Sequence, residues 1–358
     1  MSGRVLVTGA SGFIGSRVCE HLRLGRDVPV RALVHDPARA ARVARLDVEL
    51  LRGDLTDSAS LERAVAGCDA VVHCAYGTTG TGRERRTVTG MGAGLMAEAA
   101  RRAGVSRFVH LSSVSVWGFD PGPGPIDEAT PVVGASKHPY VAGKRDAERE
   151  VAAAAERGLP AVVLRPTNVF GPFSPLFTIG PVRQLRDGGV ALVGDGSTPA
   201  NTVYVDNVVH AIQLALEDDR AVGETFVVSD EDGVTWRQLY EAYARMASPP
   251  WEVRSLPLDQ VRGRRSPARA LARAAAESRL VRRAVAHRSV RALARRGAQA
   301  VLRPPQSGLP SEELSQMQTS TAVFRAEKIR SRLGYLPPVS FELAMRLTEE
   351  WLRFARFL

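Results

Sequence analysis

Apolar runs alternate with segments of helical periodicity along the first half of the chain. Continuous apolar runs predict short strands at residues 4–8, 28–34, 48–53, 68–75, 107–113 and 160–166. Apolar residues recurring every three to four positions predict helices at 13–24, 58–67, 94–104 and 140–158, and an Ala/Arg-rich helix between the second and third strands. Strands that are apolar throughout are buried on both faces. The pattern therefore predicts an α/β fold with a Rossmann-type, doubly wound parallel sheet.

The pattern loosens after residue 170. Gly/Pro-rich stretches such as "FGPFSPLFTIGP" and "GDGSTPANT" separate helices that we expect at 205–217, 235–246 and 341–357. We therefore expect a Rossmann domain at 1–170, with returning segments near 200–230, and a smaller, mostly C-terminal region at 171–358. This second region would cover the carboxyl edge of the sheet.

Positive charge is concentrated in one segment. The chain carries a formal net charge of +10, but residues 262–303 hold 13 arginines and one acid, Glu277. That segment has a net charge of +12 and the rest of the chain −2. It can be drawn as a helical insertion that is simply solvated, or that docks on an anionic membrane surface or an acidic carrier protein. No aromatic residues interleave with the charges, so we do not expect nucleic-acid binding.

Cysteine usage and hydropathy bear on location. The three cysteines (Cys19, Cys68 and Cys74) are odd in number and lack metal-ligand spacing, so we expect a reducing compartment and no metal site. A strand-like run begins by residue 4, which leaves no room for a signal peptide, and no apolar stretch approaches the roughly 20 residues needed to cross a bilayer. We expect a cytoplasmic protein, and a homodimer is compatible with the sequence.

A glycine-rich loop lies between the first strand and the first helix. In "VLVTGASGFIGSRV", Gly9 permits a tight turn, Gly12 lets the backbone approach a pyrophosphate, and Gly15 lets the helix pack on the strand. The helix that follows offers unpaired N–H groups and a positive dipole to phosphates. Because the glycine loop begins a βαβ series, it predicts a dinucleotide-binding site rather than an ordinary glycine turn.

Further motifs follow the glycine loop in order: "RGDLTD", "VVHCAYG", "GVSRFVHLSSVSVWG", "YVAGK", "VVLRPTNVFGP" and "GDGSTPANTVYVDNVVHA". With the GxxGxxG spacing, this series resembles the extended short-chain dehydrogenase/reductase family, which includes NAD-dependent epimerases and dehydratases and 3β-hydroxysteroid dehydrogenase-like members. The resemblance covers most of the chain except 250–310. It implies an NAD(P)-binding domain at 1–170, a substrate-binding region at 171–358, and cofactor contacts from Gly9, Gly12, Phe13, Ile14, Gly15, Leu55, Cys74, Ala75 and Pro166.

Tyr140 and Lys144 are four residues apart, so they share one face of the helix expected at 140–158. Among 48 Lys and Arg residues only three are lysines, so a lysine at this spacing is unusual. A nearby ammonium would favour the phenolate and lower the tyrosine pKa from about 10. A compact ammonium can also reach a ribose hydroxyl, which the planar fork of arginine would fit badly. We predict that Tyr140 exchanges a proton with the substrate and that both residues contact the cofactor.

The third catalytic group would be a hydroxyl at the end of the preceding strand. The resemblance assigns it to Ser113, four residues before Trp117, while Ser112 would satisfy backbone groups at the strand end. The family also carries an asparagine that relays protons. In this chain Thr87 or Thr89 stands there, so the relay has no matching residue.

The end of the second strand bears on cofactor choice. NAD-preferring relatives carry an acid there that binds the ribose 2′-hydroxyl, whereas this chain has Val34. Nearby His35 and Arg39 suit a 2′-phosphate, which favours NADP over NAD, with Asp36 turning back to a ribose as the alternative. The resemblance also implies that Asp54 meets the adenine, and a turn-capping role is its alternative.

Two departures from the family narrow the reaction. Dehydratases carry Asp-Glu after the catalytic hydroxyl, where this chain has Val114 and Ser115, so dehydration is not expected. Sugar-nucleotide enzymes place a diphosphate-binding arginine where this chain has Ala200. For an apolar-bodied substrate we expect contacts from Tyr76, Trp117, Asn168, Phe170, Phe173, Phe177 and Tyr204, with a place in the core as the alternative for the aromatic residues.

We therefore expect an NAD(P)-dependent oxidoreductase that transfers hydride between nicotinamide and a carbinol or ketone carbon of a small molecule. The alternatives are a sugar-nucleotide epimerase with tightly bound NAD and a catalytically silent NAD(P)-binding module. The intact set of Ser113, Tyr140 and Lys144 argues against the silent module.

Overall fold

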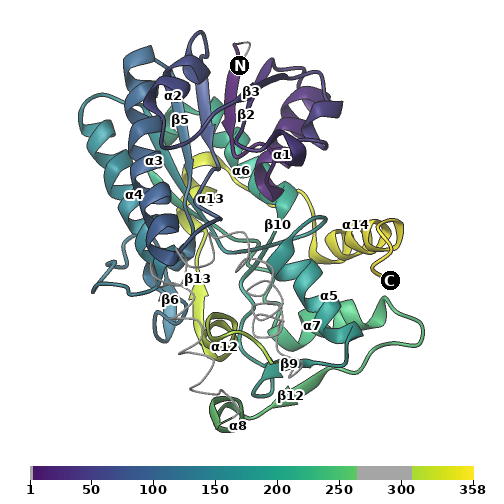
Figure 1. Ribbon diagram of the computed structural model, residues 1–358. Coiled ribbons are helices and arrows are strands. Elements are labelled where there is room, and N and C mark those ends of the chain that lie inside the picture. The colour runs from purple at the N-terminus through teal and green to yellow at the C-terminus, as the bar shows by residue number, and fades with distance from the viewer. Residues whose placement is uncertain (1–2, 264–308) are drawn as a thin grey trace, which may run out of the picture.

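A seven-stranded parallel sheet forms the centre of the molecule in a computed structural model that describes residues 3–263 and 309–358 (Figure 1). The strand order is β11-β7-β5-β4-β1-β2-β3, and every neighbouring pair is parallel. The strands are β1 (Val5–Thr8), β2 (Val30–Val34), β3 (Glu49–Arg52), β4 (Ala70–His73), β5 (Arg107–Leu111), β7 (Ala161–Pro166) and β11 (Thr225–Val228). The order reverses direction at β1, as in a doubly wound Rossmann sheet, which confirms the predicted fold class.

Helices cover both faces of the sheet (Figure 1). One face carries α1 (Phe13–Glu20), α6 (Val205–Glu217) and α13 (Glu327–Leu333), and the other carries α2 (Ser58–Val65), α3 (Gly82–Ala103) and α4 (Pro139–Glu156). Successive strand residues point to opposite faces. Val5 and Val7 therefore belong to the core under α1 and α6, whereas Leu6 belongs to the core under α2, α3 and α4.

Helix α3 is twice as long as predicted. Residues 94–104 were expected, but the helix begins at Gly82 behind a capping box formed by Thr81 and Glu84. Glycines let α4 approach it closely, because a Cβ on Gly90 would lie 2.7 Å from the Cβ of Asp146. The first half of α3 escaped the sequence analysis because its apolar positions are few.

The prediction of a helix between β2 and β3 is wrong. The structure has only two short 3₁₀ turns there, Pro37–Arg39 and Val43–Arg45. The Asp36 carboxylate accepts from the Ala38 N–H and starts the first turn. Local turn chemistry at Asp36 and Pro37 thus overrides the helical propensity of the Ala/Arg-rich sequence.

The second region lies beyond the carboxyl ends of the sheet strands (Figure 1). Three parallel pairs lie here, and two of them include a strand from before residue 171: β8 (Asn168–Phe170) with β10 (Thr202–Tyr204), β9 (Val190–Val193) with β12 (Arg254–Leu256), and β6 (Gly124–Ile126) with β13 (Ala322–Phe324). Its helices are α5 (Gly180–Arg186), α7 (Trp236–Arg245), α8 (Leu258–Gly263), α12 (Glu312–Thr319) and α14 (Phe341–Phe354). Several long connections therefore return to this edge of the sheet.

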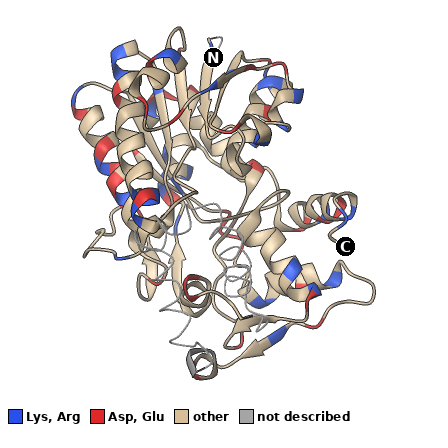
Figure 2. Cartoon of the chain, viewed as in Figure 1, with Lys and Arg blue, Asp and Glu red and all other residues tan. Residues whose placement is uncertain are grey.

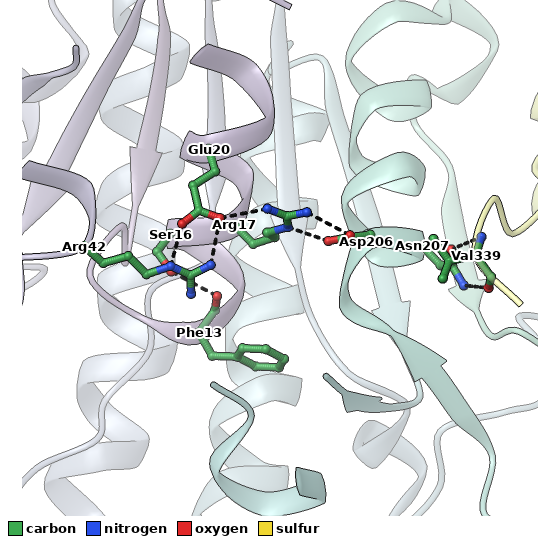
Figure 3. Close-up of polar contacts among 8 residues, drawn as sticks. All are labelled: Phe13, Ser16, Arg17, Glu20, Arg42, Asp206, Asn207 and Val339. Atoms are coloured by element: carbon green, nitrogen blue, oxygen red, sulfur yellow. Dashed lines mark hydrogen bonds and ion pairs between the residues drawn. The ribbon is translucent and has the colours of Figure 1, made fainter. Parts of the chain in front are cut away.

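An ion-pair network ties α1 to α6 (Figure 3). The Arg17 guanidinium binds both carboxylate oxygens of Asp206, at 2.5 and 2.9 Å, and also contacts Glu20 at 2.9 Å. Arg42 makes two further hydrogen bonds to Glu20. These paired interactions favour the charged form of Arg17 and raise its pKa.

The residue after Asp206 fastens the C-terminal part of the chain to α6 (Figure 3). The Asn207 amide donates to the Val339 carbonyl at 2.9 Å and accepts from the Val339 N–H at 3.0 Å. Asn207 is fully buried, so these bonds are shielded from water.

Charged residues of both signs are interspersed along α3 and α4 (Figure 2). The Arg-rich segment at 262–303 lies almost entirely outside the described residues, and so does the expected helical insertion. No helix in the described ranges combines the length and apolarity that a membrane span requires.

Candidate active site

One cavity follows the carboxyl edge of the sheet. Its volume is about 2010 Å³, and it extends from the glycine loop into the second region. The ends of the sheet strands supply one wall, and residues 174–190 and 309–324 supply much of the other. This is the position at which doubly wound sheets bind their ligands.

The glycine loop has the geometry that its spacing predicts. Gly9 adopts a positive φ of 65°, and a Cβ there would lie 2.9 Å from backbone atoms of Ala75. The Gly12 N–H donates to the Gly9 carbonyl at 2.8 Å. A Cβ on Gly15 would lie only 2.3 Å from that same carbonyl oxygen. The loop is thus a backbone cradle in which side chains would collide, and it fits a pyrophosphate.

All the residues expected to contact the cofactor line this one cavity. They are Gly9, Gly12, Phe13, Ile14, Gly15, His35, Arg39, Asp54, Leu55, Cys74, Ala75, Tyr140, Lys144 and Pro166. They come from the ends of several strands and from α4, so only the folded sheet brings them together. The cradle and this wall together fit a nicotinamide dinucleotide.

The end of the cavity beyond β2 and β3 is rich in potential donors. His35 Nδ1 lies 3.4 Å from Asp54 Oδ2, and the N–H of Thr56 holds the pKa of Asp54 below its usual value. Arg39 and Arg52 also line this end. Sequence reasoning missed Arg52, although its place as the last residue of a strand next to "GDL" was a usable signal.

Ser113, Tyr140 and Lys144 line the centre of the cavity. The Lys144 side chain is buried, and its Nζ donates to the Leu111 carbonyl at 2.6 Å. The ring of Tyr76 packs edge-on against the ring of Tyr140, with centroids 5.9 Å apart. Ser113 follows β5, and its Oγ accepts from the Ser115 N–H at 3.1 Å. The structure thus brings the three expected catalytic groups to one place.

Burial sets the protonation states of this group. It raises the pKa of Tyr140 to about 12, a change that the hydroxyls of Ser113 and Ser115 oppose. Burial also lowers the pKa of Lys144 to about 8. From the sequence we expected Lys144 to lower the Tyr140 pKa, but desolvation has the larger effect. Tyr140 therefore holds its proton at neutral pH and is in the state needed to donate it.

Thr89 lies beside the site on α3. Its Oγ1 donates to the Arg85 carbonyl at 2.7 Å and accepts from the Gly77 N–H at 3.0 Å. Its only proton is therefore committed to helix backbone, which leaves it poorly suited to carry protons. Thr87, the alternative position, lines a separate surface groove between α3 and α4.

The expected substrate contacts divide into two groups. Tyr76, Asn168 and Phe177 line the cavity, whereas Phe173 packs on Trp351 outside it. Asn168 Nδ2 donates to the Ala200 carbonyl at 2.7 Å, which leaves its Oδ1 as an acceptor. Trp117, Phe170 and Tyr204 do not reach the cavity wall and lie in the packed core.

Each of the three core aromatics has partners that hold it there. Trp117 Nε1 donates to the Thr130 carbonyl, and the Arg165 guanidinium lies over its ring. Phe170 and Tyr204 pack on each other with centroids 5.5 Å apart. The position of an aromatic residue next to a motif therefore did not show whether its side chain lies in the core or lines the cavity.

Several cavity residues were not foreseen. His138 precedes α4, and its Nε2 lies 3.2 Å from Glu313 Oε1 of α12. Apolar and aromatic side chains extend the wall into the second region: Tyr240, Leu314, Met317 and Phe324. His138 could have been noticed two residues before Tyr140. The α12 residues carry no motif and reach the site only through the tertiary fold.

The fold, the glycine cradle and the Ser113, Tyr140 and Lys144 group define a nicotinamide-dinucleotide enzyme. The sequence profile of the NAD dependent epimerase/dehydratase family matches residues 5–229. The chain belongs to this family, within the extended short-chain dehydrogenases/reductases.

Curated relatives include several activities. The chain is 31% identical over 245 residues to a 2-alkyl-3-oxoalkanoate reductase of Stenotrophomonas maltophilia, covering 66% of this chain and 73% of the relative. It is 33% identical over 280 residues to a dTDP-glucose 4,6-dehydratase of Streptomyces niveus, with 71% and 81% covered. A 3 beta-hydroxysteroid dehydrogenase/Delta 5-->4-isomerase of Mycobacterium tuberculosis is 31% identical over 247 residues, with 65% and 66% covered.

Among solved structures, a UDP-glucose 4-epimerase of Thermotoga maritima superposes with a TM-score of 0.72 at 22% identity, covering 99% of both chains. A UDP-glucuronic acid 4-epimerase of Bacillus cereus in complex with NAD gives a TM-score of 0.71 at 18% identity, with 98% and 99% covered. At these identities the likeness concerns the fold.

Proposed function

We propose that this enzyme is an NADP-dependent reductase or dehydrogenase of a small apolar-bodied ketone or carbinol. The observation that carries the proposal is one continuous cavity that joins the glycine cradle, Ser113, Tyr140 and Lys144 to a largely apolar wall. Its main competitor is an NAD-containing epimerase of sugar nucleotides.

The preference for NADP rests on the cavity end near β2 and β3. His35, Arg39 and Arg52 would surround a ribose 2′-phosphate, and arginines bind phosphate through paired hydrogen bonds. Asp36, the residue that would favour a free 2′-hydroxyl, has its carboxylate engaged with the Ala38 N–H. The strand end itself is Val34, which offers no acceptor.

The catalytic roles follow from the protonation states. A bound reduced nicotinamide supplies the hydride that forms the new C–H bond at the carbonyl carbon. Tyr140 donates its phenolic proton to the carbonyl oxygen, and Ser113 holds that oxygen as negative charge develops. Lys144 places an ammonium beside the phenolate that remains. In the opposite direction, Tyr140 takes the proton back from the carbinol.

The character of the second region favours an uncharged, apolar substrate body. Phe177, Leu314, Met317 and Phe324 line it. A nucleoside diphosphate needs cations, and within residues 171–263 and 309–358 Arg254 is the one arginine or lysine that lines the cavity. Arg85 of α3 lines the cavity from the other side, and its Nη1 donates to the Gly80 carbonyl. One Arg254 nitrogen already donates to the Gly188 carbonyl at 2.9 Å. Ala200 is buried and offers no charge. The reductase and the hydroxysteroid dehydrogenase are the relatives whose names agree with this chemistry.

Replacing Tyr140 with phenylalanine tests the proposal. We expect NADPH-dependent reduction of 2-alkyl-3-oxoalkanoates or oxosteroids to fall by about 10²-fold or more, because the acid is lost. NADPH affinity should stay within a few-fold, measured by calorimetry. Tyr204→Phe is the matched control and should retain activity, because that ring lies in the core.

Two results would contradict the proposal. Full activity of Tyr140→Phe would remove the assigned acid. Conversion of UDP-glucose without added cofactor, by protein purified with NAD bound, would establish the epimerase instead.

A further inference from the structure

A row of polar side chains crosses the centre of the sheet close to Lys144. Thr8, His73 and His110 occupy matching positions on β1, β4 and β5. They are between 0% and 1% exposed. Two residues earlier on the same strands, and on the same face, stand Leu6, Val71 and Phe108, which belong to an apolar core. A polar row in this layer needs hydrogen-bond partners.

A hydrogen bond occupies one nitrogen of His73. The Thr8 hydroxyl lies 2.8 Å from His73 Nδ1, and the Ala75 N–H donates to Thr8 Oγ1 at 3.3 Å. Because a hydroxyl has one proton and two lone pairs, Thr8 can donate to His73 Nδ1 or accept from it. Within the described residues, His73 Nε2 has no partner.

His110 lies next to it with neither ring nitrogen partnered in the described part of the chain. The two imidazoles stack with centroids 5.5 Å apart and an interplanar angle of 20°. Burial, together with the charge of Lys144, lowers the pKa of both rings, that of His73 to about 3. Both rings are therefore neutral at physiological pH. His110 offers one donor and one acceptor, and His73 offers its Nε2.

Lys144 has more hydrogen-bond donors than recorded protein acceptors. Its ammonium carries three N–H donors, and the one protein acceptor recorded for it is the Leu111 carbonyl, next to His110 in the chain. Cys74 and Glu148 are the other titratable groups that favour its charged form, and Tyr76 lies with its ring centroid 5.6 Å from Nζ. The Ser112 hydroxyl follows His110 on the same face of β5 and also lacks a partner among the described residues.

We propose that His110, with His73, holds a buried water that bridges to the Lys144 ammonium and keeps this lysine charged and in place beneath Tyr140. A water is a donor and an acceptor at once, so it can accept from Lys144 and donate to an imidazole nitrogen. His110 is then a positioning residue that acts on the reaction through Lys144. The proposal rests on the proposed function only for its activity readout.

The scarcity of lysine gives a direct test. The chain contains three lysines, Lys137, Lys144 and Lys328, so protein labelled with ¹³C-lysine has three Cε signals, and Lys144→Arg assigns the buried one. His110→Phe keeps an aromatic ring but removes both nitrogens. We expect the titration midpoint of Lys144 to fall by about 0.5 to 1 pH unit, because the ammonium loses a hydrogen-bonded neighbour.

Two further variants separate a specific effect from general disturbance. His110→Asn retains a donor and an acceptor and should return the midpoint to within about 0.3 unit of the unaltered protein. His21→Gln changes a histidine that bonds Gln213 on the opposite side of the sheet and should leave the midpoint unchanged. Turnover against pH should move with the Lys144 midpoint in each variant.

An unchanged Lys144 midpoint in folded His110→Phe would overturn the proposal. If that variant does not fold, a high-resolution crystal structure of the unaltered protein decides. A water within hydrogen-bond distance of Lys144 Nζ and of one imidazole nitrogen supports the proposal, and no such water overturns it. The lysine titration needs no substrate, so its result tests this proposal even if the proposed function is wrong.

Discussion

At the scale of single residues, the surroundings of Lys144 distinguish it from the other two lysines. Its Nζ is buried against the Leu111 carbonyl, whereas Lys328 pairs with Glu224 at 2.8 Å and is about one third exposed. A planar guanidinium would need a wider opening than this corner offers.

Lys144→Arg should therefore lower turnover by about 10²-fold although it keeps the charge. The loss would be read from steady-state rates with NADPH. Lys137→Arg, in the exposed loop before α4, is the control and should be silent. Equal activity of the two variants would mean that charge alone suffices at position 144.

Arg39 and Arg52, which line the cavity near β2 and β3, allow a test of the proposed preference for NADP. Arg39→Ala and Arg52→Ala should each weaken NADP binding by about tenfold or more, because each removes a charge-assisted contact to the 2′-phosphate. NAD affinity should change little. Arg45→Ala, outside the cavity, serves as the control in the same calorimetric titrations. Equal weakening of NADP and NAD would assign these arginines to another part of the cofactor.

The neutral buried histidines make the protein sensitive to acid. In the unfolded chain each histidine binds a proton below its ordinary pKa of about 6.5, while in the folded protein it does not until far lower pH. Stability contributed by this difference is present above pH 6.5 and is lost as the pH falls from there towards 3. Asp230, whose pKa burial raises to about 7, acts in the opposite sense.

His110→Asn isolates the contribution of one histidine. Between pH 7 and pH 5, its free energy of unfolding should fall by about 2 kcal/mol less than that of the unaltered protein. Urea unfolding at the two pH values measures the difference. The effect of Asp230 is common to both proteins and cancels. Parallel pH dependences would show that His110 titrates normally.

At the scale of elements, the glycine loop and α1 form one rigid turn. A Cβ on Gly15 would lie 2.3 Å from the Gly9 carbonyl oxygen, so Gly15→Ala must displace the helix or the loop. We expect a loss of about 2 kcal/mol or more in unfolding free energy and a marked loss of dinucleotide affinity.

Gly25→Ala is the matched control for that change. A Cβ at position 25 meets its nearest neighbour, His21, at 3.6 Å, an ordinary contact. Thermal unfolding and NADPH titration should place this variant near the unaltered protein. If Gly15→Ala behaved the same way, the third glycine would not govern packing of helix on strand.

The elements also show what sequence can predict. Helix α6 was predicted at its observed bounds because its apolar face is continuous and meets one sheet. The connection between β2 and β3 was predicted as a helix because Ala and Arg favour helices, yet Asp36 and Pro37 form a turn. Strand ends carry local motifs, so the residues that line the cavity along the carboxyl edge of the sheet could be predicted. Glu313 and Met317 could not, because only long-range folding brings α12 to the cavity.

At the scale of the whole molecule, the pair of Arg17 and Asp206 joins elements 189 residues apart. The two side chains are 40% and 23% exposed, so water screens the attraction. A double-mutant cycle with Arg17→Met and Asp206→Asn should give a coupling free energy of about 1 kcal/mol. Chemical denaturation of the four proteins measures it.

The pair of Arg26 and Glu217 provides a comparison within the same interface. Arg26 lies in the chain just after α1, and Glu217 is the last residue of α6. The two side chains are more exposed than those of Arg17 and Asp206, at 42% and 33%. Its coupling should be near zero, because an isolated surface pair contributes little. A larger coupling free energy for Arg26 and Glu217 than for Arg17 and Asp206 would contradict this explanation. It would show that two hydrogen bonds and partial burial do not strengthen the ion pair of Arg17 and Asp206.

The parallel pairing of β6 with β13 bears on the order in which the protein matures. Ala322 pairs with Gly124, so β6 can pair with β13 only after about two hundred further residues have been made. On the ribosome, β1 to β5 can collapse with α2 and α3 from nearby contacts, because such contacts close short loops. The wall formed by α12 and β13 can be added only after residues 312–324 have been made. A nascent chain would therefore acquire its dinucleotide cradle well before it could retain a substrate, and maturation of this enzyme would run in that order.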